Sequence, residues 1–249
     1  MDEVTPNMKL SSHSTPVTDI APILNLLGLP LLGVPQRPAI DISSGELVER
    51  PLEGKPMKLR CYRLPDFSLP SGKIFASDAY CPIGDPMTSA FHQTVKPGTY
   101  PLLILVADLD GDEPVVFAML RFSEEPVVRW EMAIRGDMDA SKLEPDEIVG
   151  YGTDSGLGCF ADPNAWLHLG SDASPPDLFE KIDKEINANY KYKHGWLHIE
   201  TPKGSVAMFS LGFGDSNFCV SYFGLNSKGK PVVLLSDLEI VDWPNRPQK

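Results

Sequence analysis

Apolar and polar positions alternate in short runs along most of the chain, and clusters of Pro, Gly, Asp and Asn separate these runs. Short runs rich in β-branched and aromatic residues are typical of β-strands. The pattern predicts strands over residues 58–64, 73–78, 100–109, 114–122, 127–134, 195–200, 205–212, 218–225 and 231–241. Between them, Gly111 and Gly229 stand in turn sequences that need a positive φ, so two connections are expected to be hairpins between antiparallel strands.

One segment, at 174–192, has a helical period instead. Ser174 can cap this helix, Pro175 suits its first position, and Asp177 completes a capping box. The apolar positions that share one helical face are Leu178, Phe179, Ile182, Ile186 and Tyr190. We therefore expect an α+β fold: a mainly antiparallel β-sheet, or two packed sheets, with one long helix packed on it.

The N-terminal part of the chain differs in composition from the rest. Residues 1–56 are rich in Pro and polar turn residues, which predicts a Pro-rich, partly ordered segment, followed by a single α+β domain over 57–249. The most apolar early stretch, Ile20–Pro35, is broken by proline and glycine and is shorter than a membrane span. We expect this stretch to pack on the domain.

The charge balance restricts the class of partner. The chain has 34 Asp and Glu against 22 Lys and Arg, a net charge of −12. A field of that sign repels nucleic acid and anionic membranes, and it favours encounter with a basic protein. The four cysteines are widely spaced with no CxxC pair, which favours free thiols in a reducing compartment, and so a cytoplasmic protein.

The stretch GYGTDSGLGCFADP at 150–163 contains four glycines. Their spacing is not that of a dinucleotide-binding fingerprint, and no Gly-Lys-Ser/Thr follows as in a P-loop. The glycines allow the main chain to bend sharply. The candidate residues of a functional loop here are Asp154, Cys159 and Asp162, with Asp215 in a second glycine-rich turn.

Several separated motifs point to a known family. GYGTDSGLGCFAD, with SGKIFASD (71–78), KPGTYPLLILV (96–106), RFSEEPVVRWEMA (121–133) and the segment 209–238, resembles the bacterial domain-of-unknown-function family numbered 4241. The similarity runs from about residue 68 to residue 241. This resemblance implies a domain identity and no particular activity, because the family has none assigned.

Aspartates in turns and at strand ends are candidate metal ligands: Asp78, Asp154, Asp162, Asp215 and Asp237. Three carboxylates brought together could hold a divalent cation. The alternative is that each aspartate bonds its own backbone in a turn, which requires no function. No other cofactor is predicted.

Cys159 is the one candidate nucleophile, and it would need a neighbouring histidine as base. The histidines considered for this role are His92, His168, His194 and His198. The alternative is a buried cysteine in the core, the commoner place for this residue type. No G-x-S-x-G elbow is present, which disfavours a serine hydrolase. No set of residues forms a catalytic constellation, so no catalytic residue is assigned and a non-enzymatic protein is favoured over an enzyme.

Contacts with a partner are expected from loops. Trp166 and Phe213 are the candidate aromatic contacts, and Asp110, Asp112 and Glu113 are the candidate acidic ones. The sequence thus predicts a non-enzymatic acidic binding protein, such as an immunity protein that neutralises a basic partner toxin. Two alternatives stay open: a metal-dependent hydrolase that uses the Asp cluster, and a module that senses a small ligand.

Overall fold

Two antiparallel β-sheets form the body of the protein. The computed structural model describes residues 8–31, 34–35, 39–41, 48–50, 57–82, 84–109, 111–144, 147–171, 174–191, 194–211 and 218–247. The five-stranded sheet has the order β1 (Lys9–Ser11), β12 (Trp196–Thr201), β13 (Gly204–Ser210), β11 (Leu157–Ala161) and β6 (Phe75–Asp78). All its strand pairs are antiparallel.

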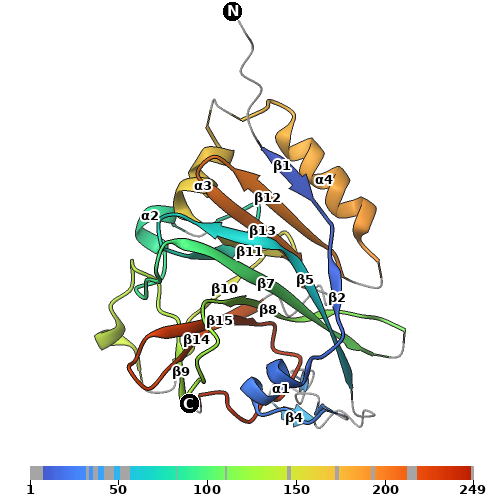
Figure 1. Ribbon diagram of the computed structural model, residues 1–249, viewed down its shortest axis with the longest axis vertical. Coiled ribbons are helices and arrows are strands. Elements are labelled where there is room, and N and C mark those ends of the chain that lie inside the picture. The colour runs from blue at the N-terminus through green and yellow to red at the C-terminus, as the bar shows by residue number, and fades with distance from the viewer. Residues whose placement is uncertain are drawn as a thin grey trace, which may run out of the picture.

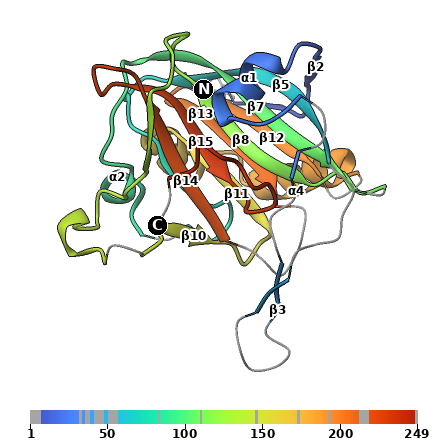
Figure 2. The same ribbon diagram turned by 90° about the horizontal axis from the view of Figure 1, so that it is seen from below.

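The larger sheet has eight strands, and every pairing in it is antiparallel too. Its order is β10 (Gly150–Gly152), β14 (Phe218–Leu225), β15 (Pro231–Asp237), β8 (Val115–Arg121), β7 (Gly98–Asp108), β5 (Lys58–Leu69) and β2 (Thr15–Val17), with β9 (Arg129–Met132) paired to β14. Figure 2 shows β14, β15, β8 and β7 side by side. A separate pair joins β3 (Ala39–Asp41) to β4 (Val48–Arg50). The mainly antiparallel α+β architecture with two sheets is therefore confirmed.

Both predicted hairpins are present. Leu109 pairs with Asp112 across the turn between β7 and β8, and Gly111 in that turn has φ 106°. Gly229 has φ 72° in the turn between β14 and β15. Glycine adopts these angles without the steric penalty that other residues meet, so the turn residues also determine which strands become neighbours.

The helices are short: α1 (Ala21–Leu27), α2 (Pro86–Ser89), α3 (Pro163–Leu169) and α4 (Leu178–Asn189). A long helix is not confirmed, because α4 has 12 residues and begins after both prolines. Ser174 does not cap it, since its hydroxyl donates to the carbonyl of His168 at 2.6 Å. Asp177 makes no capping hydrogen bond either and is paired with Lys181 at 2.8 Å.

The apolar face of α4 is narrower than the sequence predicts. Leu178, Ile182 and Ile186 are buried against the five-stranded sheet, as the period of three to four residues requires. Phe179 and Tyr190, predicted on the same face, are 48% and 49% exposed. Phe179 therefore lies at the edge of the packed stripe and is accessible to a partner.

Apolar side chains fill three layers. The first cluster lies between the two sheets and includes Phe67, Phe160 and Phe223. The second covers the outer face of the eight-stranded sheet, where Leu24 and Leu27 of α1 meet the C-terminal segment. The third lies between the five-stranded sheet and helices α3 and α4, which both lie in the upper part of Figure 1. Each sheet is thus covered on both faces.

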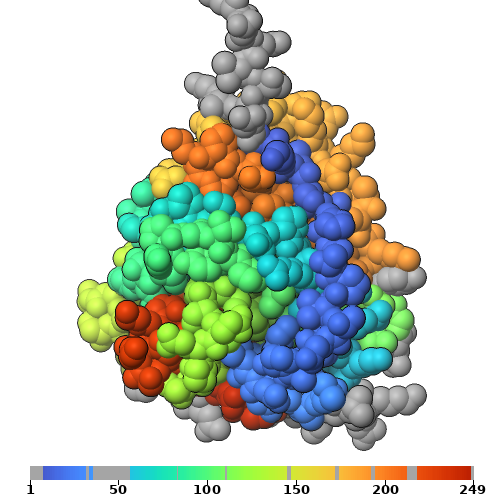
Figure 3. All heavy atoms as spheres, viewed as in Figure 1, coloured from blue at the N-terminus to red at the C-terminus, as the bar shows by residue number. Residues whose placement is uncertain are grey.

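The N-terminal residues take part in both sheets. Strand β1 pairs with β12 at the edge of the smaller sheet, and β2 pairs with β5 at the edge of the larger one. Figure 3 shows this segment, in blue, running along the surface of the molecule. The apolar stretch that follows packs on the sheet through α1, as predicted, with Leu24, Leu27, Leu29 and Val34 buried.

Candidate functional site

The glycine-rich stretch at 150–163 connects the two sheets. It forms β10 in the larger sheet, a turn, and β11 in the smaller one. A Cβ at Gly150 would lie 2.3 Å from the carbonyl oxygen of Cys219, and one at Gly158 would lie 2.9 Å from Cε2 of Phe209. Gly156 has φ 71° with open space around it. These glycines therefore allow close packing at the crossover between the sheets.

The Asp78 side chain stabilises the turn between β10 and β11, where the chain crosses from one sheet to the other. Its Oδ1 accepts from the backbone N–H of Tyr80 and Cys81, at 2.6 and 2.8 Å, and from the Ser155 hydroxyl at 2.9 Å. Its Oδ2 accepts from the Ser155 N–H at 2.9 Å. Burial alone would raise the pKa of Asp78, but these hydrogen bonds favour the carboxylate and lower the pKa below its usual value. The group is an anchor for the turn before β11.

Asp162 joins three elements. Its Oδ1 accepts from the N–H of Asn164 at 2.9 Å and so caps α3, and its Oδ2 accepts from the N–H of Ser71 at 2.9 Å. Its own N–H donates to the carbonyl of Ser205 in β13 at 3.0 Å. This buried carboxylate fixes α3 against both the turn after β5 and the neighbouring strand.

Asp237 holds the C-terminal segment. It is fully buried, accepts from Trp243 Nε1 at 2.9 Å, and lies 3.5 Å from Nη1 of Arg246. Burial raises the pKa of Asp237 to about 6, although the Arg246 guanidinium opposes the rise. Arg246 also donates to the Tyr222 hydroxyl at 2.9 Å and pairs with Glu239.

The structure does not bring the candidate cation ligands together. Asp154 is exposed in the turn, whereas Asp78, Asp162 and Asp237 each have their own partners. Asp215 lies outside the described residues, as does Phe213. Among the residues that the structure describes, no group of three or more His, Cys, Asp or Glu side chains could hold a metal ion.

Cys159 is a core residue. It is fully buried in the layer under α3 and α4, and burial raises the pKa of its thiol to about 12. A thiolate nucleophile needs the opposite shift. Three of the four histidines considered as its base have other partners: His92 binds the Met138 carbonyl, His194 that of Glu113, and His198 the Ser205 hydroxyl.

The predicted acidic contacts lie at the turn between β7 and β8. Asp110 is outside the described residues, and Asp112 is partly buried. Glu113 pairs with Arg60, and its Oε2 lies 3.8 Å from Nδ1 of His194. The Glu113 charge is thus partly compensated within the protein itself.

Trp166 lines an apolar groove. The prediction of a loop was wrong here, because Asp162 and Pro163 begin a helix and place Trp166 in α3. The groove has a volume of about 320 Å³ and lies between α2, α3 and α4. Its lining includes Tyr80, Pro82, Pro86, Trp166, Leu169 and Phe179. The sequence pattern does not indicate the contributions of Tyr80 and Phe179, because the helical period places Phe179 on the buried face.

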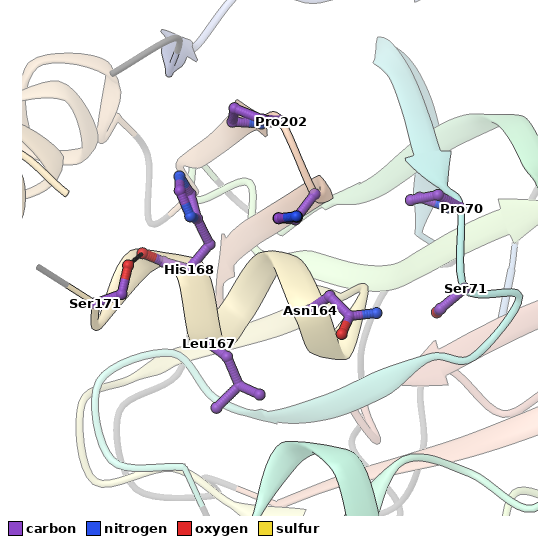
Figure 4. A pocket seen from close by; sticks show the side chains of 8 residues that line it. Pro70, Ser71, Asn164, Leu167, His168, Ser171 and Pro202 are labelled. Atoms are coloured by element: carbon purple, nitrogen blue, oxygen red, sulfur yellow. Dashed lines mark hydrogen bonds between the residues drawn. The ribbon is translucent and has the colours of Figure 1, made fainter. Parts of the chain in front are cut away.

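A second, more polar cavity of about 570 Å³ lies beside α3. The turn after β5 contributes Pro70 and Ser71, α3 contributes Asn164 and His168, and the turn between β12 and β13 contributes Pro202 and Lys203. Figure 4 shows His168 on the side of α3 that faces Pro202, whereas Leu167 points away from it. Leu167 lines both the cavity and the apolar groove, so the two sites share one helix.

A family model described as "Protein of unknown function (DUF4241)" matches residues 67–236. The chain belongs to this family. The match confirms the resemblance of the sequence motifs, and it begins within β5 and ends within β15. Neither the curated proteins nor the solved structures contain a match to this chain.

The DUF4241 range contains the whole lining of both the groove and the cavity. It does not contain β1, at an edge of the smaller sheet, or β2, at an edge of the larger one. It also lacks α1 and the Asp237–Arg246 cluster, which lie on the outer face of the larger sheet. In the part of the chain that the structure describes, no helix is long and apolar enough to cross a membrane.

Proposed function

We propose that this protein is a non-enzymatic acidic binding protein that holds a basic protein partner in the groove between α2, α3 and α4. The observation that carries this proposal is a concentration of exposed apolar side chains. Leu167 is 44% exposed, Phe179 48% and Met87 38%, and these are three of the seven large apolar residues exposed in the described part of the chain. Leu167 and Phe179 line the groove directly, and Met87 follows Pro86 in α2. Apolar groups gathered around a groove are typical of an interaction site.

The charges near the groove indicate the chemistry of the partner. The segment 177–189 carries four acidic residues against two lysines, and Asp183 accepts a hydrogen bond from the Tyr80 hydroxyl at the groove wall. Asp85 caps α2 next to Pro86. A partner segment with one bulky apolar side chain flanked by Arg or Lys fits such a site, because aromatic rings also attract cations.

This role is consistent with an immunity protein that covers the active site of a basic toxin in the cytoplasm. The acidic residues Asp112 and Glu113 of the β7–β8 turn lie on another part of the chain, so we propose that they contribute long-range attraction. A cation-dependent hydrolase receives no support from the described residues, in which the candidate aspartates lie apart.

The test is a selection of displayed random peptides on the purified full-length chain, followed by titration of the selected peptides. We expect sequences with one large apolar residue between basic residues, and affinity that falls as salt is raised from 50 to 500 mM. Phe179→Ser should weaken binding at least about tenfold, because a buried interface anchor contributes more than about 1.4 kcal/mol.

Val128→Ser is the matched control, since Val128 is 58% exposed and does not line the groove. It should leave the affinity unchanged. Selected peptides that are acidic, or that bind the Phe179→Ser and wild-type proteins equally well, would refute the proposal.

A further inference from the structure

The cavity beside α3 has rigid walls. Gly204 adopts φ 126°, and a Cβ there would lie 2.9 Å from both Asp162 Cβ and Pro70 Cδ. The Thr201 hydroxyl donates to the Gly204 carbonyl at 2.9 Å and accepts from the Lys203 N–H at 3.0 Å, which fixes the turn between β12 and β13. Asp162 holds the opposite walls together through Asn164 and Ser71. The cavity is thus preformed.

Two polar groups of the cavity lining, on His168 and Lys203, have no partner among the described residues. Nε2 of His168 is fully buried and has no hydrogen-bond partner. Lys203 makes no ion pair with any described residue, whereas Lys9, Lys142 and Lys181 each pair with a carboxylate. A buried ring nitrogen without a partner is destabilising, so a turn of the His168 ring that brings this nitrogen to a ligand atom in the cavity would gain affinity.

We propose that this cavity binds a small organic monocarboxylate. The Lys203 ammonium and an N–H of the His168 imidazole supply positive charge and a donor for the carboxylate, and Asn164 lies opposite Ser71 at the other end (Figure 4). Pro70, Pro202 and Leu167 give apolar walls that suit a short hydrocarbon body.

Lys203 is the one permanently charged cation among the described residues of the cavity lining, and it matches a ligand that carries one negative charge. A phosphate group carries about −1.5 to −2 at neutral pH, and the buried Asp162 carboxylate beside Asn164 would repel the excess. The lining therefore selects a singly charged carboxylate over a phosphate. This site is separate from the protein-binding groove of the proposed function and does not depend on it.

The test is an NMR titration of the ¹⁵N-labelled full chain with isobutyrate at constant ionic strength. We expect saturable shifts of Ser71, Asn164 and Lys203 and of the His168 ring nitrogens, with a dissociation constant on the order of 1 mM for so small a ligand. Isobutyramide has nearly the same shape without the charge and should cause no such shifts.

Variants assign the binding to the cavity. Lys203→Gln should weaken isobutyrate binding about tenfold or more, because it removes a charge-assisted contact. Lys228→Gln, at an exposed lysine in the β14–β15 turn, should leave binding unchanged. Phe179→Ser should also leave it unchanged, and that result separates this site from the groove.

Four results would each overturn the proposal. These are the absence of saturable shifts at the cavity, equal shifts with isobutyramide, unchanged affinity in Lys203→Gln, and tighter binding of inorganic phosphate than of isobutyrate. The chemical shifts of residues remote from the cavity report whether each variant keeps the fold.

Discussion

The Asp162 carboxylate accepts a hydrogen bond from the backbone N–H of Ser71 at 2.9 Å, across 91 positions of sequence. The same side chain caps α3 through Asn164. One residue thus determines where α3 lies relative to the smaller sheet, and α3 in turn supplies a wall to both the groove and the cavity.

Asp162→Ala should lower the free energy of unfolding by about 2–4 kcal/mol, because it removes a helix cap and leaves the Ser71 N–H without its partner. Asp85→Ala is the matched control. Asp85 also caps a helix that begins with proline, but it is exposed, so its loss should cost about 1 kcal/mol. Urea denaturation of the two variants measures the difference, and equal effects would contradict the role of the Ser71 bond.

Substitutions of two glycines in the same crossover should differ strongly. Gly150→Ala places a methyl group 2.3 Å from a backbone carbonyl oxygen and should destabilise the fold by about 3 kcal/mol or more. Gly156→Ala meets open space and only the left-handed backbone penalty, about 1–2 kcal/mol. Thermal and urea unfolding of both variants test this order. A reversed order would mean that β10 does not approach β14 so closely.

Asp237 should make stability depend on pH in the direction opposite to that of most carboxylates. Its pKa is raised from 3.8 to about 6 in the folded protein, so the folded state binds the proton more tightly than the unfolded state does. The stabilisation that comes from protonated Asp237 is complete below pH 3.8 and is lost as the pH rises through about 6.

The measurement compares wild type with Asp237→Asn between pH 4 and pH 7. The wild-type free energy of unfolding, relative to that of the variant, should fall with rising pH by on the order of 2–3 kcal/mol. The Asn variant serves as the reference that removes the contributions of all other titrating groups. A relative stability that rises with pH would contradict the buried environment of this carboxylate.

Thiol reactivity should separate the cysteines. Of the four, Cys81 is exposed, and Cys61, Cys159 and Cys219 are buried. A disulfide reagent at neutral pH should therefore modify one thiol rapidly, and Cys81→Ser should abolish that phase. The other three should react only after denaturation. Rapid modification of Cys159 in the native protein would restore it as a candidate nucleophile.

The strands were predictable because each depends on local pattern. The runs over 100–109 and 218–225 are apolar, contain β-branched or aromatic residues and end at turn residues, and they correspond closely to β7 and β14. The short strand β1 has no such pattern. Its residues become a strand because β12 offers an unpaired edge, which is a property of the assembled sheet.

The candidate residues were only partly predictable. Asp78, Asp162 and Asp237 were identified as unusual, but residue type alone does not distinguish a metal ligand from an anchor for distant backbone groups. The helical period placed Phe179 on the buried face, whereas it is 48% exposed, and Lys203 gave no local signal. Their relevance depends on which elements α4 and the β12–β13 turn lie against.

The amino-acid sequence by itself determined the antiparallel strands, the two glycine hairpins, the acidic balance and the family, since all of these depend on residue types and spacing within short segments. Only the tertiary structure decided that the glycine-rich stretch crosses between two sheets, that its cysteine is buried, and that α3 separates an apolar groove from a polar cavity. The physical reason is that burial and hydrogen-bond partners are set by residues far apart in the chain, and no local pattern encodes which of them meet.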